Sequence, residues 1–313
     1  MTERHNTDLA SGGHLGFPAD VLTRRSLLAA TAGAATAAAA GLAGRQAAAD
    51  DASPAVTRGQ INQSAALWCF QPMKVETLAR ATAALGMKSV ELVDPKDWPI
   101  LKKYGLVCAI TLSHLFVRGM NHKKYHPECL EKLTKAIEVT SAAGWPNVIT
   151  FSGMREKLTD EQGIKTTVEG LKKVIGLAEK KKVNICLEPL NTRVDIEMKG
   201  HPGYQCDKVE WAVEVCDKIG SPRMKILFDI YHTQIMQGDI ITRIEQYKDY
   251  IGHYHTAGVP GRNELDNTQE INYPAIMRAI VKTGYKGYVG QEFIPKSKDK
   301  IASLRAAVKL CDV

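Results

Sequence analysis

The chain has 313 residues, of which 44% are hydrophobic and 24% charged, and its formal net charge is +7. This composition is ordinary for a soluble globular protein with a substantial core. Because Lys and Arg are interspersed with Asp and Glu, the charge indicates solvated helix faces and argues against a nucleic-acid-binding stripe. The seven cysteines form no C-x-x-C pair, which argues against a disulfide framework or a zinc knot and predicts small buried side chains.

The first 49 residues differ from the rest in composition. The twin arginines Arg24 and Arg25 precede a stretch, to residue 43, that consists almost entirely of Ala, Gly, Thr and Leu, and Ala47–Ala49 offers a small-residue cleavage site. This pattern predicts a twin-arginine export signal over residues 1–49, recognised by the twin-arginine export machinery, and a periplasmic or secreted mature protein. A membrane anchor and an Ala-rich disordered tail are the alternatives. The stretch is short and weakly apolar for a spanning helix. No other segment is long and apolar enough to cross a bilayer, so stable membrane insertion of the mature chain is not expected.

Short apolar runs then alternate with amphipathic stretches, which is the pattern of β-α units around a parallel sheet. Eight runs are predicted as strands: 61–69, 89–93, 106–113, 147–151, 183–188, 224–229, 251–256 and 288–293. Apolar residues at three- and four-residue steps predict buried helix faces over residues 130–140 and 164–178.

Eight such units over about 250 residues favour a closed (β/α)₈ TIM barrel, whose active site lies at the carboxyl ends of the strands. A doubly wound open sheet is the competing architecture. It would normally carry a glycine-rich phosphate turn, and no G-x-G-x-x-G or G-x-x-x-x-G-K-[ST] motif occurs. We therefore predict a flexible lead-in over residues 50–59 and a single barrel domain over residues 60–313.

Four candidate metal ligands end four successive predicted strands: Glu188, Asp229, His255 and Glu292. Each has an alternative interpretation when taken singly. A strand-end Glu is common, Asp229 could cap a helix, and His253 and His255 could both be structural histidines. Together, three carboxylates and one imidazole predict a divalent-metal site for Mn²⁺, Mg²⁺ or Co²⁺, with Zn²⁺ less expected because it usually brings more His or Cys.

Residues near these ligands are candidate substrate contacts. Arg262 ends the loop Gly258-Val259-Pro260-Gly261-Arg262 and could clamp a carboxylate or a hydroxyl, although a surface Arg is the alternative. His232 follows Asp229 by three residues. His114, with Glu91, Thr111 and Ser152, lies near the end of an earlier strand, where it could line the pocket.

Several motifs of the C-terminal half resemble those of hydroxypyruvate isomerases, which are grouped with the ketose 3-epimerases among the xylose-isomerase-like TIM barrels. The motifs are Leu187-Glu188-Pro189-Leu190-Asn191, His201-Pro202-Gly203-Tyr204, Phe228-Asp229-Ile230-Tyr231-His232, Gly258-Val259-Pro260-Gly261-Arg262, Glu270-Ile271-Asn272-Tyr273-Pro274 and Gly290-Gln291-Glu292. The resemblance covers roughly residues 60–300 and is most specific towards the C-terminus.

The resemblance implies that Glu188 and Glu292 are the catalytic pair and that Glu188, Asp229, His255 and Glu292 hold a divalent metal. It also implies a small hydroxy-carbonyl or sugar substrate. Hydroxypyruvate isomerases often carry Gln at the position of His255, whereas the 3-epimerases carry His. The metabolic isomerases are typically cytoplasmic, which conflicts with the predicted export signal.

The chemistry expected of this site is proton transfer through an enediolate. Return of the proton to the adjacent carbon gives isomerisation, and return to the opposite face of the same carbon gives epimerisation. The leading hypothesis is therefore a metal-dependent isomerase, with a ketose or keto-sugar 3-epimerase as the alternative. A homo-oligomer is compatible with either activity. An exported, non-catalytic sugar-binding protein and an AP-endonuclease-like hydrolase are two further alternatives.

Overall fold

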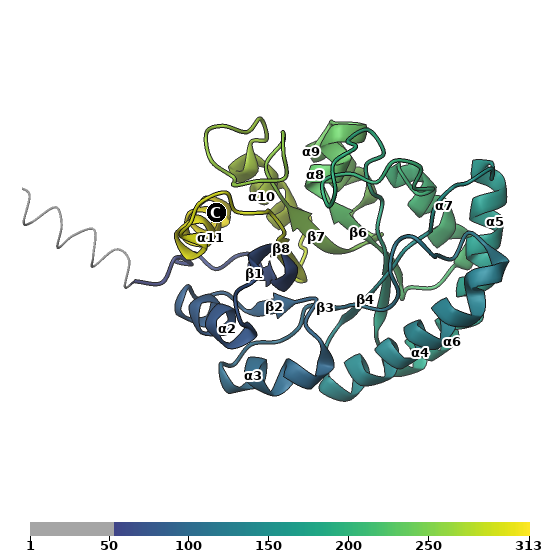
Figure 1. Cartoon of the computed structure of the whole chain (residues 1–313), viewed down its shortest axis with the longest axis horizontal. Helices are drawn as coiled ribbons and strands as arrows, with labels where there is room; N and C mark the ends of the chain where they lie inside the picture. Colours follow the sequence, from purple (N-terminus) through teal and green to yellow (C-terminus); the bar gives the residue numbers. More distant parts are fainter. Residues whose placement is uncertain (1–52) are drawn as a thin grey trace, which may run out of the picture. The chain divides into compact units, whose positions relative to one another are not determined.

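The computed structural model describes residues 53–313, which form one compact unit (Figure 1). The predicted export signal over residues 1–49 lies outside the described residues. The strands are β1 (Asn62–Ala66), β2 (Ser89–Glu91), β3 (Ile110–Thr111), β4 (Asn147–Thr150), β5 (Asn184–Leu187), β6 (Met224–Asp229), β7 (Ile251–Thr256) and β8 (Tyr288–Gln291).

Helices connect and surround these strands (Figure 1). The α-helices are α2 (Val75–Ala84), α3 (Trp98–Lys103), α4 (His126–Ala143), α5 (Asp160–Leu171), α6 (Ile175–Lys181), α7 (Val209–Ile219), α8 (Ile230–Met236), α9 (Ile240–Tyr247), α10 (Tyr273–Lys282) and α11 (Lys300–Cys311). Three short 3₁₀ helices are η1 (Leu67–Phe70), η2 (Pro95–Asp97) and η3 (Lys123–Tyr125).

The strands pair in parallel in the order β2-β1-β8-β7-β6-β5-β4-β3. Pairing of β1 with β8 joins the first and last strands of the described residues, as a barrel requires and a doubly wound sheet does not. Between β2 and β3 the ladder is short, but Val90 N–H donates to Val107 O (3.2 Å) and Leu92 N–H donates to Ile110 O (3.1 Å). These bonds bring the ring to near closure, and they confirm the predicted TIM barrel.

Each of the eight predicted runs contains a strand, and local signals set several helix boundaries. A capping box of Thr159 and Gln162 begins α5, and left-handed Gly144 and Gly220 follow the ends of α4 and α7. The periodic face predicted over residues 164–178 is divided between α5 and α6. Most of its apolar side chains are buried, and Ile175 is partly buried.

The segment before β1 differs from the predicted flexible lead-in. Ala55 is buried, and its backbone N–H donates to Leu85 O (3.0 Å). The Asp312 carboxylate accepts hydrogen bonds from the backbone N–H groups of Thr57, Arg58 and Gly59 at 2.6–2.8 Å. Residues 55 and 56 are therefore held by Leu85, and residues 57–59 by Asp312 near the C-terminus. Local composition does not reveal either contact.

The seven cysteines are free and buried, as the sequence analysis predicts. Within residues 53–313, no helix combines the length and the apolar character needed to cross a bilayer.

Candidate active site

Four side chains converge at the carboxyl ends of β5, β6, β7 and β8. Ligand atoms of Glu188, Asp229, His255 and Glu292 all lie within 4.8 Å of one another, and all four residues are buried. His255 Nδ1 lies 3.0 Å from Glu292 Oε2 and 3.6 Å from Glu188 Oε1. Because the four strands are adjacent and parallel, their ends meet on one face of the barrel. The structure thus brings together the four predicted metal ligands.

Asp229 has two roles that the sequence analysis treated as alternatives. Its Oδ1 caps α8 by accepting from the backbone N–H groups of Tyr231 (2.7 Å) and His232 (3.2 Å). Its Oδ2 points to the cluster and lies 3.5 Å from the Arg262 guanidinium. Capping therefore fixes the carboxylate and leaves one oxygen for the site.

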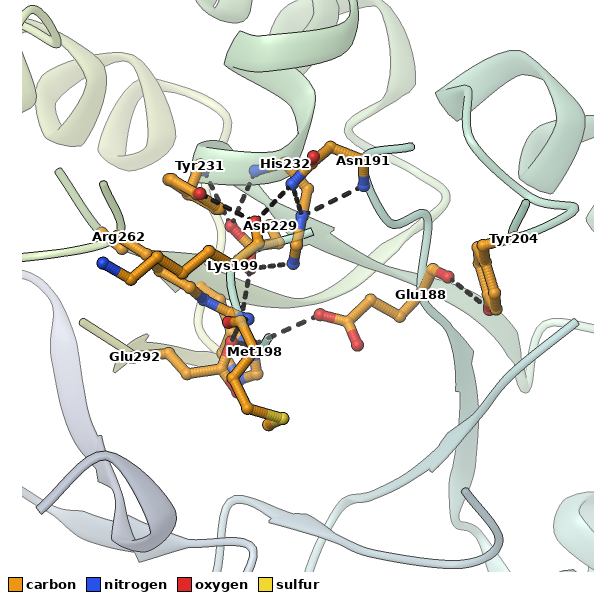
Figure 2. Close-up of polar contacts among 12 residues, drawn as sticks. Glu188, Asn191, Met198, Lys199, Tyr204, Asp229, Tyr231, His232, Arg262 and Glu292 are labelled. Carbon is orange, nitrogen blue, oxygen red and sulfur yellow. Dashed lines mark hydrogen bonds and ion pairs between the residues drawn. The ribbon is translucent and has the colours of Figure 1, made fainter. Parts of the chain in front are cut away.

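Arg262 is buried, so the alternative of a surface arginine is wrong. Its Nη1 donates to Met198 O (2.7 Å), and its Nη2 pairs with the Glu292 carboxylate (Figure 2). The guanidinium also lies over the rings of Trp68 and Tyr231, at 5.0 and 5.5 Å from their centroids. Its backbone is left-handed (φ 57°), a conformation that costs free energy in a non-glycine residue and that the surrounding contacts maintain.

The tautomer of His232 follows from its hydrogen bonds. The Asn191 backbone N–H donates to His232 Nδ1 (3.1 Å), so Nδ1 is an acceptor and the proton of the neutral ring is on Nε2. Burial, reinforced by Arg262, holds the pKa of His232 well below its ordinary value, which keeps the ring neutral. His232 Nε2 has no hydrogen-bond partner and lies 3.6 Å from Asp229 Oδ2. A donor is therefore available beside the cluster.

The two glutamates of the cluster have opposite pKa shifts. Burial raises the pKa of Glu188 to about 7. Burial acts in the same direction on Glu292, but His255 and Arg262 outweigh it and hold the pKa of Glu292 at about 2. Trp68 Nε1 also donates to Glu292 Oε1 (2.9 Å). A pair of carboxyl groups with separated pKa values is a common arrangement for proton transfer.

A fourth carboxylate, that of Glu91 of β2, lies behind His255. His255 Nε2 is 2.7 Å from Glu91 Oε1, and His253 Nε2 is 3.1 Å from Glu91 Oε2. The neighbouring Gly290 of β8 admits this carboxylate, since a Cβ there would lie 2.1 Å from Glu91 Oε1. A bond from Nε2 to a carboxylate orients the ring and directs Nδ1 to the cluster.

The cluster meets the chemical requirements of a divalent cation. It offers carboxylate oxygens with one imidazole nitrogen, the donor set of Mn²⁺, Mg²⁺ or Co²⁺. Two buried atoms of the cluster that could bind a cation, Glu188 Oε1 and His255 Nδ1, have no hydrogen-bond partner. Burial without a hydrogen bond costs free energy, which the ion pairs within the cluster offset in part and a bound cation would offset further.

A pocket of about 230 Å³ opens over the cluster, and Glu188, Glu292 and Arg262 line its floor together with His201. Burial, reinforced by Arg262, lowers the pKa of His201 to about 4, so this imidazole is neutral near pH 7.

The other predicted pocket residues, His114, Thr111, Ser152 and Glu91, are not among those that line the pocket. His114 is buried, with Nε2 at 2.9 Å from Thr150 Oγ1 and Nδ1 facing backbone carbonyls. Thr111 and Ser152 are likewise engaged in internal hydrogen bonds. Glu91 lies under His255 and does not line the pocket. Trp68 was missed, because a Trp just after a strand carries no signal of a distant carboxylate partner.

The chain belongs to the xylose isomerase-like TIM barrel family, whose sequence model matches residues 79–310. It is 34% identical over 228 residues to hydroxypyruvate isomerase of Escherichia coli, covering 69% of this chain and 86% of that protein. A putative hydroxypyruvate isomerase of Homo sapiens is 30% identical over 226 residues, covering 71% of this chain and 75% of that protein. A 2-oxo-tetronate isomerase of Cupriavidus necator is 30% identical over 164 residues, with 52% of this chain and 60% of that protein covered.

These relatives show that the protein is an isomerase enzyme related to hydroxypyruvate and 2-oxo-tetronate isomerases. Among solved structures, an AP endonuclease of family 2 from Brucella melitensis is 25% identical with a TM-score of 0.69, covering 78% of this chain and 97% of that chain. An L-ribulose 3-epimerase is 16% identical with a TM-score of 0.63, covering 80% and 92%, and this similarity shows the fold alone.

The comparisons correct the predicted location. The expectation of a periplasmic or secreted protein came from residues 1–49, whereas the relatives are hydroxypyruvate isomerases, which the sequence analysis identifies as typically cytoplasmic. The periplasmic or secreted assignment is therefore wrong. An Ala-rich segment after two arginines is a compositional signal, and composition alone did not establish export.

Proposed function

We propose that the protein is a divalent-metal-dependent isomerase of a small α-hydroxy carbonyl compound, with hydroxypyruvate as the first candidate substrate. The observation that supports this most strongly is the pair of carboxyl groups, Glu188 and Glu292, with separated pKa values beside an imidazole and a third carboxylate. The names of the relatives support the same substrate class.

A bound divalent cation would be held by Glu188, Asp229, His255 and Glu292, and would supply polarisation of the substrate carbonyl. One of the two residues Glu188 and Glu292 removes the carbon-bound proton of the substrate, and the same or the other residue returns a proton. Removal of that proton leaves its electron pair in a new carbon–carbon double bond and moves the carbonyl electrons to oxygen, which gives an enediolate. Delivery of a proton to the former carbonyl carbon, with transfer of the hydroxyl proton between the two oxygens, completes the isomerisation.

His232 and Arg262 are the proposed substrate contacts. His232 Nε2–H is an unpartnered donor beside Asp229, so it can hydrogen-bond a substrate oxygen. Arg262 brings a buried positive charge that can balance a substrate carboxylate or the developing enediolate. Arg262 also holds Glu292 in place, because the two side chains form an ion pair.

The test is deuterium exchange. Metal-loaded protein is incubated with hydroxypyruvate, tartronate semialdehyde and ketoses in deuterated water, and carbon-bound deuterium is followed by NMR. We expect metal-dependent exchange that falls about 10³-fold in Glu292→Gln. Glu270→Gln, at an exposed position, is the matched control and should exchange like the wild type. Equal exchange in Glu292→Gln and the control would refute the proposal.

A 3-epimerase is the second candidate, and His255 favours it because the epimerases carry His where hydroxypyruvate isomerases often carry Gln. The position of the label separates the two activities. Deuterium at the former carbonyl carbon indicates isomerisation, and deuterium with inverted configuration at the original carbon indicates epimerisation.

A further inference from the structure

The wall of the pocket differs from its charged floor. Six apolar side chains that follow or belong to β2, β3 and β4 line it: Leu92, Leu112, Leu115, Phe116, Ile149 and Phe151. Leu190 and Met198, from the loop after β5, extend the same apolar surface. A ligand held at the floor must therefore direct the rest of its structure against hydrocarbon.

Exposed apolar side chains continue this wall out of the pocket. Among residues 53–313, six large hydrophobic residues are exposed, and five of them lie on the loops after β3 and β5: Leu112, Leu115, Val117, Ile196 and Met198. Leu115 is 61% exposed, which is costly unless something covers it. The sixth, Ile241, lies on α9. The exposed apolar surface is thus concentrated at the mouth of the active site.

The lining offers few partners for distal hydroxyl groups. Its polar side chains are Glu188, His201, Arg262 and Glu292, and the first and last belong to the reacting cluster. The Trp68 indole N–H already donates to Glu292. His201 is neutral and packs against Phe116, with ring centroids 4.4 Å apart. A polyhydroxylated chain entering this pocket would lose hydrogen bonds to water and regain few.

We infer that hydroxypyruvate represents only the reacting end of the natural substrate, which carries an apolar, deoxygenated substituent where hydroxypyruvate carries its carboxylate. The charged floor holds the reacting end, and the wall formed after β2, β3, β4 and β5 covers the apolar end. This inference rests on the proposed function and names the substrate class of the same site.

The experiment uses substrates of matched length. Erythrulose and 1-hydroxybutan-2-one share a four-carbon skeleton and a CH₂OH–C=O end, and they differ in the hydroxyl groups on the distal carbons. Deuterium exchange at the hydroxymethyl carbon is measured for both, and then for 1-hydroxypentan-2-one and 1-hydroxyhexan-2-one. We expect kcat/KM to favour the deoxy compound over erythrulose and to rise roughly threefold per added methylene. If the hydroxyketones do not turn over, their inhibition constants against hydroxypyruvate give the same ratios.

Leu115→Ser tests the wall, and Ile241→Ser is its matched control at the exposed hydrophobic residue outside the pocket. The rise with chain length should become shallower in Leu115→Ser and stay as in the wild type in Ile241→Ser. A preference for erythrulose, a flat chain-length series or an unaffected Leu115→Ser variant would each overturn the inference.

Two further outcomes separate the explanations. No exchange with any compound, hydroxypyruvate included, refutes the proposed function itself. Exchange with hydroxypyruvate and erythrulose but no gain from the deoxy compounds refutes only the inference.

Light scattering of the wild type and of Leu115→Ser tests the alternative that a second copy of the chain covers this apolar wall. A dimer that Leu115→Ser dissociates, with unchanged chain-length preference, would assign the wall to self-association.

Discussion

The two halves of the barrel contribute different chemistry to the mouth of the active site. Strands β5–β8 end in Glu188, Asp229, His255 and Glu292, whereas β2–β4 lead into leucine, isoleucine and phenylalanine side chains. Glu91 of β2 is the exception, and it points beneath the site to support His255. Under the proposed function, one half of the barrel would carry the reaction and the other would shape what can react. Substitutions in the two halves should therefore affect different measurements.

The largest effect is expected for Glu188→Gln in the reacting half. The variant keeps the volume of the side chain but cannot accept or return a carbon-bound proton, so exchange should fall about 10³-fold. Glu270→Gln again serves as the control. Loss of less than about tenfold would mean that Glu292 alone carries the proton transfer, and the two carboxyl groups would no longer form a functional pair.

The second-largest effect is expected on metal affinity, because Glu91 of β2 orients His255. Glu91→Gln should weaken Mn²⁺ binding by about 10- to 100-fold, because His255 loses the carboxylate that orients it. Gly290→Ala should have a similar effect, since its Cβ would displace the Glu91 carboxylate. The double variant should be little worse than either single variant, because both act through one hydrogen bond.

Calorimetric titration of the metal measures these affinities, and thermal melting of the metal-free variants checks the fold. Gly176→Ala, where an added Cβ meets nothing within 4 Å, is the matched glycine control. Strictly additive losses in the double variant would show that Glu91 and Gly290 affect the metal site independently.

A smaller effect, on stability, follows from the raised pKa of Glu188. Its ordinary pKa is 4.5 and its folded value is about 7, so between these values the folded metal-free protein holds a proton that the unfolded chain has released. The contribution of Glu188 to stability therefore falls as pH rises through this window, by up to ~1.4 kcal/mol per pH unit. Glu188→Gln should stabilise the metal-free protein, and more so at pH 8 than at pH 5. Urea unfolding at both pH values measures the difference; a constant difference would argue against the raised pKa.

The smallest effect is expected for a conservative change in the wall. Ile149→Val removes one methyl group from β4, so the free energy of unfolding should fall by about 1 kcal/mol. The kcat/KM for hydroxypyruvate should change by no more than about threefold, because Ile149 carries no reacting atom. A hundredfold loss of activity would show that the two halves are not functionally separable.

The sequence was sufficient to predict the strands and the four residues at their ends. Val183–Leu187 and Met224–Phe228 are apolar runs that stop at Glu188 and Asp229, and alternation predicted His253 and His255 on one face. The structure places both imidazoles against Glu91, with ring centroids 5.0 Å apart. Strand formation and side-chain alternation depend on neighbours in the sequence, so a single chain reveals them.

Other features depend on residues that are distant in the sequence. Glu91 and His255 are 164 residues apart, and the role of Gly290 is visible only when these two side chains meet beside it. His114 lies near the end of a strand, as a pocket residue would, yet its ring nitrogens face Thr150 and backbone carbonyls. Residues 57–59 of the lead-in are fixed by Asp312 at the other end of the domain.

The sequence by itself determined the barrel and the four residues that meet at its strand ends, because period-two and period-3.6 hydrophobic patterns are local and strand ends of a parallel barrel share one face. Only the tertiary structure decided that Asp229 both caps α8 and faces the cluster, that Arg262 is buried against Glu292, and that the opposite wall is apolar. These outcomes depend on burial and on contacts across the barrel. Burial and long-range contacts also set the pKa values of Glu188 and Glu292, and no local pattern encodes them.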